Sequence, residues 1–362
     1  MAGLIAVPAL AQTNVTISGR LATGYENYKL NGGAATGHDA FNAFSDQSSR
    51  IIFNVNEDLG GGLSAWGQMD FRFDFNNGNA VAPSGNTAMG LASKSWGKFS
   101  IGRWDVHYSE IDGGTNNANR AGSLQTYLGN GLMSQVNGTV IANGTRTQNL
   151  MLWDSPNWNG FTARLGYSTA PFGAEGVTNR AVGNPGDGSA WTGAVRYGNG
   201  PWKAGLSYWS ADANDSAAGV VIANGAGDQR STRVWGSYQF GMGLSIGLAY
   251  DRSSLDLGAM NSRRSAWMIP VNYAFGPHKV YFSYARAGDA SNTATDTGAN
   301  AWNLGYDYAF SKRTSAGVYY TKVNNKTGGM YDMFARAGQG AGLLTAAGED
   351  ARQIYFGLAH NF

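Results

Sequence analysis

Hydrophobic and polar residues alternate along most of this chain with a period of two. In the last twelve residues, the apolar side chains Ile354, Phe356, Leu358 and Phe362 all fall on even positions and therefore share one parity. The other parity carries Gln353, Gly357 and Asn361. Because alternate side chains of a strand point to opposite faces, one face of this segment suits hydrocarbon and the other suits a wet or close-packed interior. The pattern predicts a strand of a membrane barrel.

The segment 63–75 shows the same alternation over a longer run. Its odd positions are Leu63, Ala65, Gly67, Met69, Phe71, Phe73 and Phe75. Its even positions are Ser64, Trp66, Gln68, Asp70, Arg72 and Asp74. Segments 161–167 and 301–310 repeat the pattern, which is the period of a strand and not of a helix.

Turn-forming residues divide these runs into strands. Seven short turns are expected at 57–62, 95–98, 156–160, 198–201, 240–243, 275–278 and 310–313. Eight longer polar stretches are expected at 30–47, 76–86, 105–145, 171–189, 212–228, 253–262, 289–300 and 326–350. Fifteen connections join sixteen strands, and this even number puts both chain ends on the short-turn side. The predicted fold is all-β: a transmembrane antiparallel β-barrel of about sixteen strands with short periplasmic turns and long extracellular loops.

Composition supports a barrel in a membrane. The chain is 43% hydrophobic but only 14% charged, whereas soluble domains carry about a quarter charged residues. Its apolar stretches are too short for a spanning helix, which needs about 18 or more residues. The alternative is a soluble β-sandwich with core aromatics, which would need more charge on its outer faces. A net charge of +2 is too small to indicate a nucleic-acid partner.

The N-terminus has the features of a processed leader. Residues 1–11 are apolar and end in Ala9-Leu10-Ala11, which matches a cleavage site but lacks the basic region of a complete signal peptide. We expect a signal-peptide remnant at 1–11 and a single barrel domain at 12–362. The alternative is an apolar N-terminus that stays attached.

Several segments together resemble a known family. They are 49–53, 57–63, 101–103, Arg146 with Asn149, 153–156, 160–161 and the terminal Phe362. As a set they resemble the general diffusion porins of Gram-negative outer membranes, most closely the β-proteobacterial branch. The resemblance implies a homotrimer of sixteen-stranded barrels embedded in outer-membrane lipids. It also implies a third extracellular loop folded into each pore, small hydrophilic solutes as permeants, and a terminal aromatic, Phe362, that the barrel-assembly machinery reads.

Parity assigns charged residues to the lumen. The inward basic residues are expected to be Arg20, Arg50, Arg72, Arg146, Arg164, Arg196, Lys203, Arg233, Arg264 and Lys279. The inward acidic residues are expected to be Glu26, Asp70, Asp74, Asp154, Asp251 and Asp307. Arginine suits a pore wall because its guanidinium stays charged and offers several donors to an anion. The lumen is therefore predicted to be cationic and to prefer anions.

The predicted constriction combines a wall and a loop. Its wall residues are Arg50, Arg146, Arg103, Arg20 and Arg72, and its inward loop contributes Asp105, Glu110 and Asp112. Arg103 has outward parity, so it faces the pore only if a bulge turns it inward; otherwise it is a rim or anchoring residue. The trio Asp70, Arg72 and Asp74 shares one strand face and could instead neutralise itself.

Catalysis and cofactors have little support. His107 with Ser109 or Ser123 is the one candidate pair for a nucleophile and base. The sequence has no metal-binding spacing of histidines and no cysteine, and we expect neither an enzyme nor a cofactor. Two other functions remain open. One is a channel selective for sugars or a carboxylate, suggested by inward-parity Trp66, Trp209 and Trp235; the other is a non-conducting adhesin or structural barrel.

Overall fold

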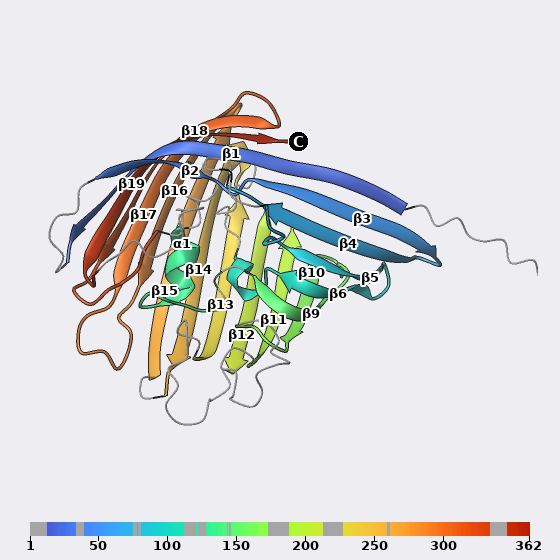
Figure 1. Ribbon diagram of the computed structural model, residues 1–362, viewed down its shortest axis with the longest axis horizontal. Helices are drawn as coiled ribbons and strands as arrows, with labels where there is room; N and C mark the ends of the chain where they lie inside the picture. The colour runs from blue at the N-terminus through green and yellow to red at the C-terminus, as the bar shows by residue number, and fades with distance from the viewer. Residues whose placement is uncertain are drawn as a thin grey trace, which may run out of the picture.

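The computed structural model describes residues 13–33, 40–74, 78, 81–111, 121, 128–142, 144, 146–172, 188–212, 227–258, 261–333 and 346–362. Most of them form one closed antiparallel sheet around a lumen (Figure 1). The strands of its first half are β1 (Thr13–Gly32), β2 (Phe41–Asp46), β3 (Arg50–Gly60), β4 (Leu63–Arg72), β5 (Thr87–Ser93), β6 (Gly97–Trp104), β9 (Thr147–Asp154) and β10 (Phe161–Ser168). Those of its second half are β11 (Ser189–Asn199), β12 (Trp202–Asp212), β13 (Asp228–Gln239), β14 (Leu244–Asp256), β15 (Asn261–Phe275), β16 (His278–Ala287), β17 (Ala299–Ala309), β18 (Thr314–Asn325) and β19 (Glu349–Asn361).

The sheet closes between its first and last strands. β1 pairs with β19 from Arg20↔Asn361 to Gly32↔Glu349. Within the described residues, seventeen strands occupy sixteen positions, because β2 and β3 both pair with β1. Closure leaves no sheet edge in hydrocarbon, where unpaired backbone groups would be costly. The predicted sixteen-stranded antiparallel barrel is confirmed.

All seven predicted short turns join neighbouring strands at one end of the barrel. The β3–β4 turn uses Gly60, Gly61 and Gly62 with φ of 81°, 60° and 80°, a conformation that favours glycine. The long connections lie at the other end. The stretch expected at 253–262 is shorter in the structure, because β14 continues to Asp256 and β15 begins at Asn261.

The burial pattern confirms the alternation. On β19, Ile354, Phe356 and Leu358 expose 51%, 60% and 50% of their surface, whereas Gln353 is buried. A closed sheet with an apolar outer face rules out the soluble-sandwich alternative, since a sandwich would bury those side chains between two sheets. No helix among the described residues is long and apolar enough to cross a membrane.

The barrel wall is uneven in height (Figure 1). β5, β6, β9 and β10 contain only 7 or 8 residues, whereas β11 to β19 contain 10 to 15. A tilted strand needs about 9–11 residues to cross a bilayer. The side formed by β5, β6, β9 and β10 is therefore lower than the side formed by β11–β19. We call the first side the low wall and the second side the tall wall.

Residues 1–12 and the loop residue Asp112 lie outside the described residues. The predicted signal remnant and domain start therefore stay predictions.

Candidate pore constriction

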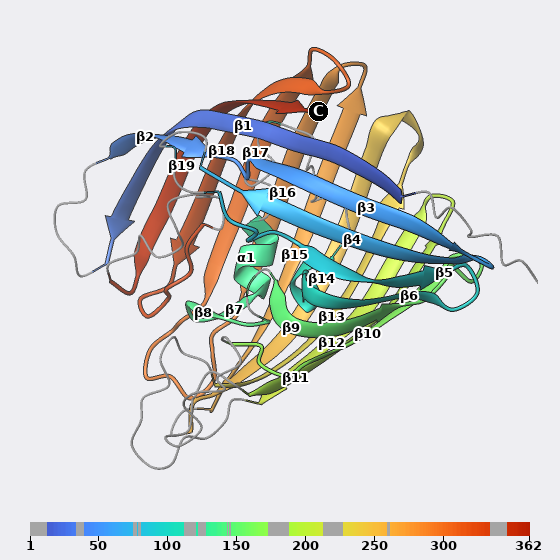
Figure 2. The ribbon, with the colours of Figure 1, turned by 45° about the vertical axis from the view of Figure 1, so that its right-hand side comes forward.

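The third long connection, residues 105–146 (L3), folds back into the barrel. Its described elements are η1 (His107–Ser109), α1 (Leu128–Met133), β7 (Gln135–Val136) and β8 (Thr139–Val140). α1 contacts β14, β15, β16 and β17, and η1 contacts β11 and β12. Figure 2 shows α1 inside the ring of strands. The inward-folded third loop is confirmed, and it crosses from the low wall toward the tall one.

Two buried arginines of the tall wall hold L3. From β13, Arg233 donates through Nη1 to the carbonyl oxygen of Tyr108 at 2.9 Å. From β15, Arg264 donates through Nε to the carbonyl oxygen of Gln135 at 2.8 Å and through Nη2 to that of Met133 at 2.7 Å. Because each guanidinium carries five donors, two side chains can bind several backbone carbonyl oxygens of L3.

Asp251 of β14 lies between these arginines. Its Oδ2 is 3.0 Å from Arg233 Nε, and its Oδ1 is 3.0 Å from Arg264 Nη1. Ser231 and Ser253 also donate to this carboxylate, at 3.0 and 2.6 Å. All three charged side chains are buried, so their prediction as pore-lining charges is wrong. Parity placed them correctly inside the barrel, but L3 covers them.

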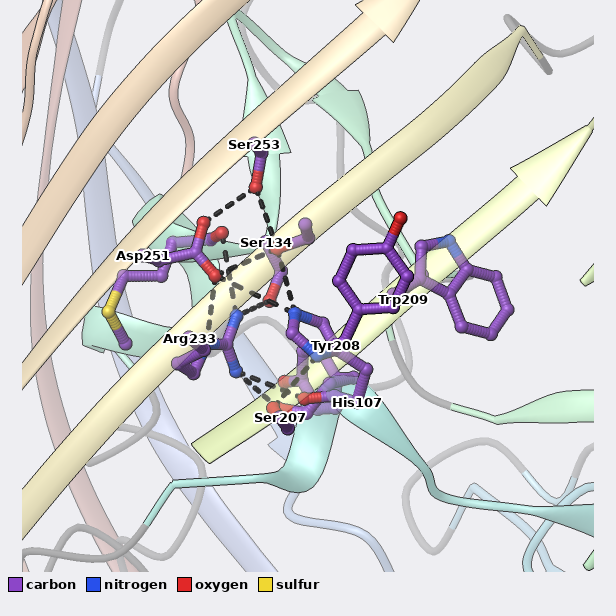
Figure 3. Close-up of polar contacts among 12 residues, drawn as sticks. His107, Ser134, Ser207, Tyr208, Trp209, Arg233, Asp251 and Ser253 are labelled. Carbon is purple, nitrogen blue, oxygen red and sulfur yellow. Dashed lines mark hydrogen bonds and ion pairs between the residues drawn. The ribbon is translucent and has the colours of Figure 1, made fainter. Parts of the chain in front are cut away.

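His107 completes this anchor (Figure 3). Its Nδ1 lies 2.9 Å from Ser207 Oγ, its Nε2 lies 2.7 Å from Ser231 Oγ, and the same Nε2 lies 3.7 Å from Asp251 Oδ2. Burial lowers the pKa of His107, so the ring is neutral at neutral pH. The neutral ring accepts one hydrogen bond and donates another, which fits an anchoring role for both nitrogens.

The structure corrects the expectation for Glu110. This carboxylate is buried and pairs with Arg196 of β11 and, at 3.5 Å, with Arg164 of β10. Arg164 also forms a bidentate pair with Asp154, at 2.7 and 3.1 Å. Glu110 therefore faces arginines, as predicted. These contacts lie on the side of L3 that packs against the wall, so the carboxylate is not exposed to the pore.

Arg20 points inward as predicted but does not line the pore. Its side chain is only 1% exposed, and its Nε donates to the carbonyl oxygen of Gln47 at 3.3 Å. The segment between β2 and β3 folds over it, since Ser49 Oγ accepts a hydrogen bond from the backbone of Ala22. Ala121 of L3 packs on the same region. Arg20 is thus a buried support rather than a wall charge.

Arg72 is largely compensated by its strand neighbour. Its Nε and Nη2 donate to the two carboxylate oxygens of Asp70 at 2.9 and 2.8 Å, and its Nη1 contacts Ser48 Oγ. The alternative in which Asp70 and Arg72 neutralise each other is the one that the contacts support. Arg50 lies opposite Arg72 on β3, and Arg20 lies opposite Arg50 on β1, so three arginines share one row.

Arg103 reaches the lumen through a bulge. The β6–β9 register shifts between Gly102 and Trp104, and Gly102 has φ of 151°. A Cβ at Gly102 would lie 2.4 Å from the carbonyl oxygen of Thr87, so glycine is required there. The charges that act on Arg103 are those of Arg146, Asp105 and Arg72. The bulge considered from the sequence is present, and it brings an outward-parity arginine to the inner side.

Arg146 and Asp105 meet where L3 leaves β6 and returns to β9. Arg146 Nε lies 3.8 Å from Asp105 Oδ2, and this Nε and that of Arg103 are buried without a hydrogen-bond partner. Burial raises the pKa of Asp105, whereas the guanidinium of Arg146 opposes this shift. Arg50, Arg72, Arg103, Arg146, Asp70 and Asp105 form what we call the constriction cluster. It holds four arginines against two aspartates.

Sequence reasoning missed one lumen cation. Lys98 was assigned to a short turn, but β6 includes it, and its Nζ lies 3.2 Å from the ring centre of Trp66 and 5.3 Å from that of Trp104. The sequence contained the signal for this placement, because Lys98 has the same parity as Ser100, which points inward.

The last long connection also enters the barrel. Tyr331, Asp332 and Met333 are buried, and Asp332 accepts a hydrogen bond from Tyr28 of β1 at 3.0 Å. Tyr331 Oη accepts one from the backbone of Asn137 in L3 at 3.2 Å. Residues 331–333 of this connection therefore lie inside the barrel, and Tyr331 contacts L3 there.

This geometry defines a class of protein: a closed membrane barrel whose own loop narrows an otherwise continuous lumen. A sixteen-stranded barrel is wide enough to leave an aqueous channel. The chain belongs to the Gram-negative porin family, whose model matches residues 1–328. It is a passive channel of the Gram-negative outer membrane.

Individual relatives support this assignment. The chain is 28% identical to an outer membrane porin of Bordetella pertussis, over 88% of this chain and 90% of that protein. It is 26% identical to outer membrane porin protein 32 of Delftia acidovorans, over 98% of this chain and 95% of that protein. Among solved structures, the anion-selective porin from Comamonas acidovorans has a TM-score of 0.76 at 24% identity, covering 97% of this chain and all of that one.

Proposed function

We propose that this porin prefers anions and that the constriction cluster sets the preference. The observation that carries the proposal is the meeting of Arg103, Arg146 and Arg72 at both ends of L3, with Asp105 as the carboxylate between them. Arg72 is paired with Asp70 and Arg146 lies against Asp105, so the four arginines and two aspartates of the constriction cluster sum to a positive charge. Among the described residues, Arg103 forms no ion pair.

Elementary electrostatics supports the assignment. The Debye length is about 8 Å at physiological salt, so wall charges at a narrow point act on every passing ion. The charges of Arg233, Arg264 and Asp251 are buried under L3, where the two arginines share one carboxylate, so they do not line the constriction itself. A relative with an anion-selective channel, the Comamonas porin, shares the fold. The proposal is tested by the zero-current potential of the parent channel in a KCl gradient, which should have the sign of chloride preference.

The alternative of a sugar-selective channel has weak structural support. Of the three tryptophans that suggested an aromatic track, Trp209 and Trp235 are 1% and 7% exposed. A buried indole cannot stack on a passing sugar. Trp66 remains, but it is engaged by Lys98.

We also propose that the channel has no catalytic activity. His107 contacts Ser207 and Ser231 rather than the predicted Ser109, whose Oγ donates to the carbonyl oxygen of Val106. His107, Ser207 and Ser231 are buried between L3 and the wall, so no substrate reaches them. Ser123 lies outside the described residues.

We infer that the low wall packs against other copies of the chain in a homotrimer. β5 and β6 are too short to span the bilayer alone, yet their outer face carries exposed apolar side chains such as Met89 and Ile101. A subunit contact would cover that face, while lipid would cover β11–β19.

Cysteine crosslinking tests the trimer face. Because the chain has no cysteine, Met89→Cys introduces a single thiol on β5. We expect a short bis-maleimide to yield a covalent dimer in native membranes. The matched variant Leu248→Cys, on the outer face of β14, should stay monomeric after denaturation. Equal crosslinking of both variants, or of neither, would contradict the assignment.

We propose that Phe362 is read by the barrel-assembly machinery. Phe362 exchanges two backbone hydrogen bonds with Gly19, at 3.0 and 3.1 Å, and so joins the last strand to the first. Its ring is 42% exposed near the short-turn interface, where a charge costs only up to about 1 kcal/mol.

Replacing Phe362 by Asp should therefore reduce assembly far more than this small cost explains. The measurement is the yield of heat-modifiable barrel in the outer membrane, compared with Phe356→Tyr as a control on the same face. Normal yield of Phe362→Asp would count against recognition of the terminal residue.

A further inference from the structure

A lysine and two tryptophans meet on the inner face of the barrel, across β4 and β6. The Nζ of Lys98 on β6 lies 3.2 Å from the ring centre of Trp66 on β4 and 5.3 Å from that of Trp104 on β6. The two indole rings meet edge to face, with their centres 5.8 Å apart. All three side chains are half-buried, so each keeps some exposed surface. We call these three residues the Trp–Lys cluster.

The residues of the strand between β4 and β6 explain why these side chains meet. Trp66 lies opposite Gly90 of β5, and Gly90 lies opposite Ser100 of β6. Since glycine has no side chain, nothing on β5 stands between the indole and β6. Lys98 is the next inward residue before Ser100, so its long side chain reaches the face of the ring.

The ammonium of Lys98 contacts rings and no carboxylate. Asp154 lies directly opposite Lys98 on β9, but its two carboxylate oxygens accept hydrogen bonds from Arg164 at 2.7 and 3.1 Å. Within the described part of the chain, Lys98 forms no ion pair and no hydrogen bond. A cation above an indole is attracted by the ring quadrupole, but a charge-assisted hydrogen bond to a carboxylate is stronger. Lys98 can therefore exchange the ring for an incoming anion.

The two indoles differ in how firmly they are held. The Nε1 of Trp66 is buried without a hydrogen-bond partner among the described residues, whereas that of Trp153 donates to the carbonyl oxygen of Trp96 at 2.8 Å. Trp104 packs against a buried hydrophobic cluster that includes Val106 of L3. The ring of Trp66 is therefore free to tilt, while that of Trp104 is fixed against the loop.

The Trp–Lys cluster lies on the short-turn side of the constriction. On β4, Trp66 is six residues before Arg72, a distance of about 20 Å along the strand. Lys98 is the second residue of β6, which begins at a short turn. A solute that enters from the long-loop end and passes the constriction cluster therefore meets the Trp–Lys cluster before it leaves the barrel.

We propose that the Trp–Lys cluster binds small aromatic carboxylates in the periplasmic half of the lumen. The carboxylate draws the ammonium of Lys98 off the indole of Trp66, and the ring of the ligand stacks on the face that the ammonium leaves. A neutral sugar has no charge to draw the lysine away, and an aliphatic acid has no ring to replace it. The inference rests on the proposed anion preference, because the constriction must first admit a carboxylate.

Block of the KCl current in planar bilayers tests this proposal. The probes are benzoate and cyclohexanecarboxylate, which carry the same charge but differ in aromaticity. The variants are Trp66→Leu, Trp66→Phe and Lys98→Met. The matched controls are Trp202→Leu, on the outer face of β12, and Lys94→Met, at an exposed site between β5 and β6. Heat modifiability shows that each variant is folded.

In the parent, benzoate should block at a concentration about two- to tenfold lower than cyclohexanecarboxylate, which is the gain expected from one aromatic pair. Trp66→Leu should abolish this difference, and Trp66→Phe should keep part of it. Lys98→Met should weaken the block by benzoate about tenfold or more, because a hydrogen bond between charged groups is lost. Both controls should behave as the parent does.

The proposal is overturned if Trp66→Leu keeps the parental preference for benzoate, or if both acids block the parent equally. Loss of the preference in Trp202→Leu would assign the effect to benzoate dissolved in the lipid and would also overturn it. The zero-current potential of the parent in KCl separates this site from the proposed function. Chloride preference without a benzoate preference overturns the site alone, whereas cation preference overturns the anion preference on which the site rests.

Discussion

Exchanging Arg103 and Arg146 for glutamate is expected to turn the channel from anion preference toward cation preference. The constriction cluster has four arginines and two aspartates, a net charge of +2. Two Arg→Glu changes subtract four unit charges and leave −2. The zero-current potential in a KCl gradient should therefore change sign. The effect should be large at 0.1 M salt, where the Debye length is about 10 Å, and small near 1 M, where it is about 3 Å.

Arg50 offers a graded comparison, because it lies in the same row as Arg72 but one strand further from L3. Arg50→Glu with Arg146→Glu should move the potential in the same direction. The control is Lys326→Glu, at an exposed site that pairs with Asp289 at 2.6 Å outside the strands. It should change the potential much less. A parental potential in the Arg103/Arg146 variant at low salt would exclude the constriction cluster as the source of selectivity.

Replacing Asp251 by alanine is expected to release L3 from the wall while the barrel stays closed. Asp251 is the carboxylate shared by Arg233 and Arg264, which hold the loop backbone at Tyr108, Met133 and Gln135. Removing one member of a buried charge network costs about 3–5 kcal/mol, because uncompensated charge stays behind. That corresponds to more than a hundredfold shift away from the docked loop.

Single-channel recording measures the release. Asp251→Ala should show a larger mean conductance and frequent flickering, while heat modifiability shows that the barrel is intact. The control Asp212→Ala removes an exposed carboxylate at the end of β12 and should leave the current unchanged. Parental conductance and noise in Asp251→Ala would contradict the anchoring role of the network.

The sequence by itself determined the barrel. Strand faces follow from a period of two, and turns follow from local residue types, so both can be predicted without knowing distant contacts. The alternation of β19, the glycine turn at 60–62 and the pairing of the chain ends were all predictable in this way. The resemblance of several segments to porins added the inward third loop.

Only the tertiary structure decided which inward charges meet the pore. Parity predicts whether a side chain points into the barrel, but it does not predict whether another segment covers that side chain. Arg20 and Arg233 both point inward, yet the segment after β2 covers one and L3 covers the other. Arg103 has outward parity and still enters the constriction cluster, because one bulge at Gly102 interrupts the alternation. Burial and bulges depend on long-range packing around a closed barrel, which the order of residues along one strand does not contain.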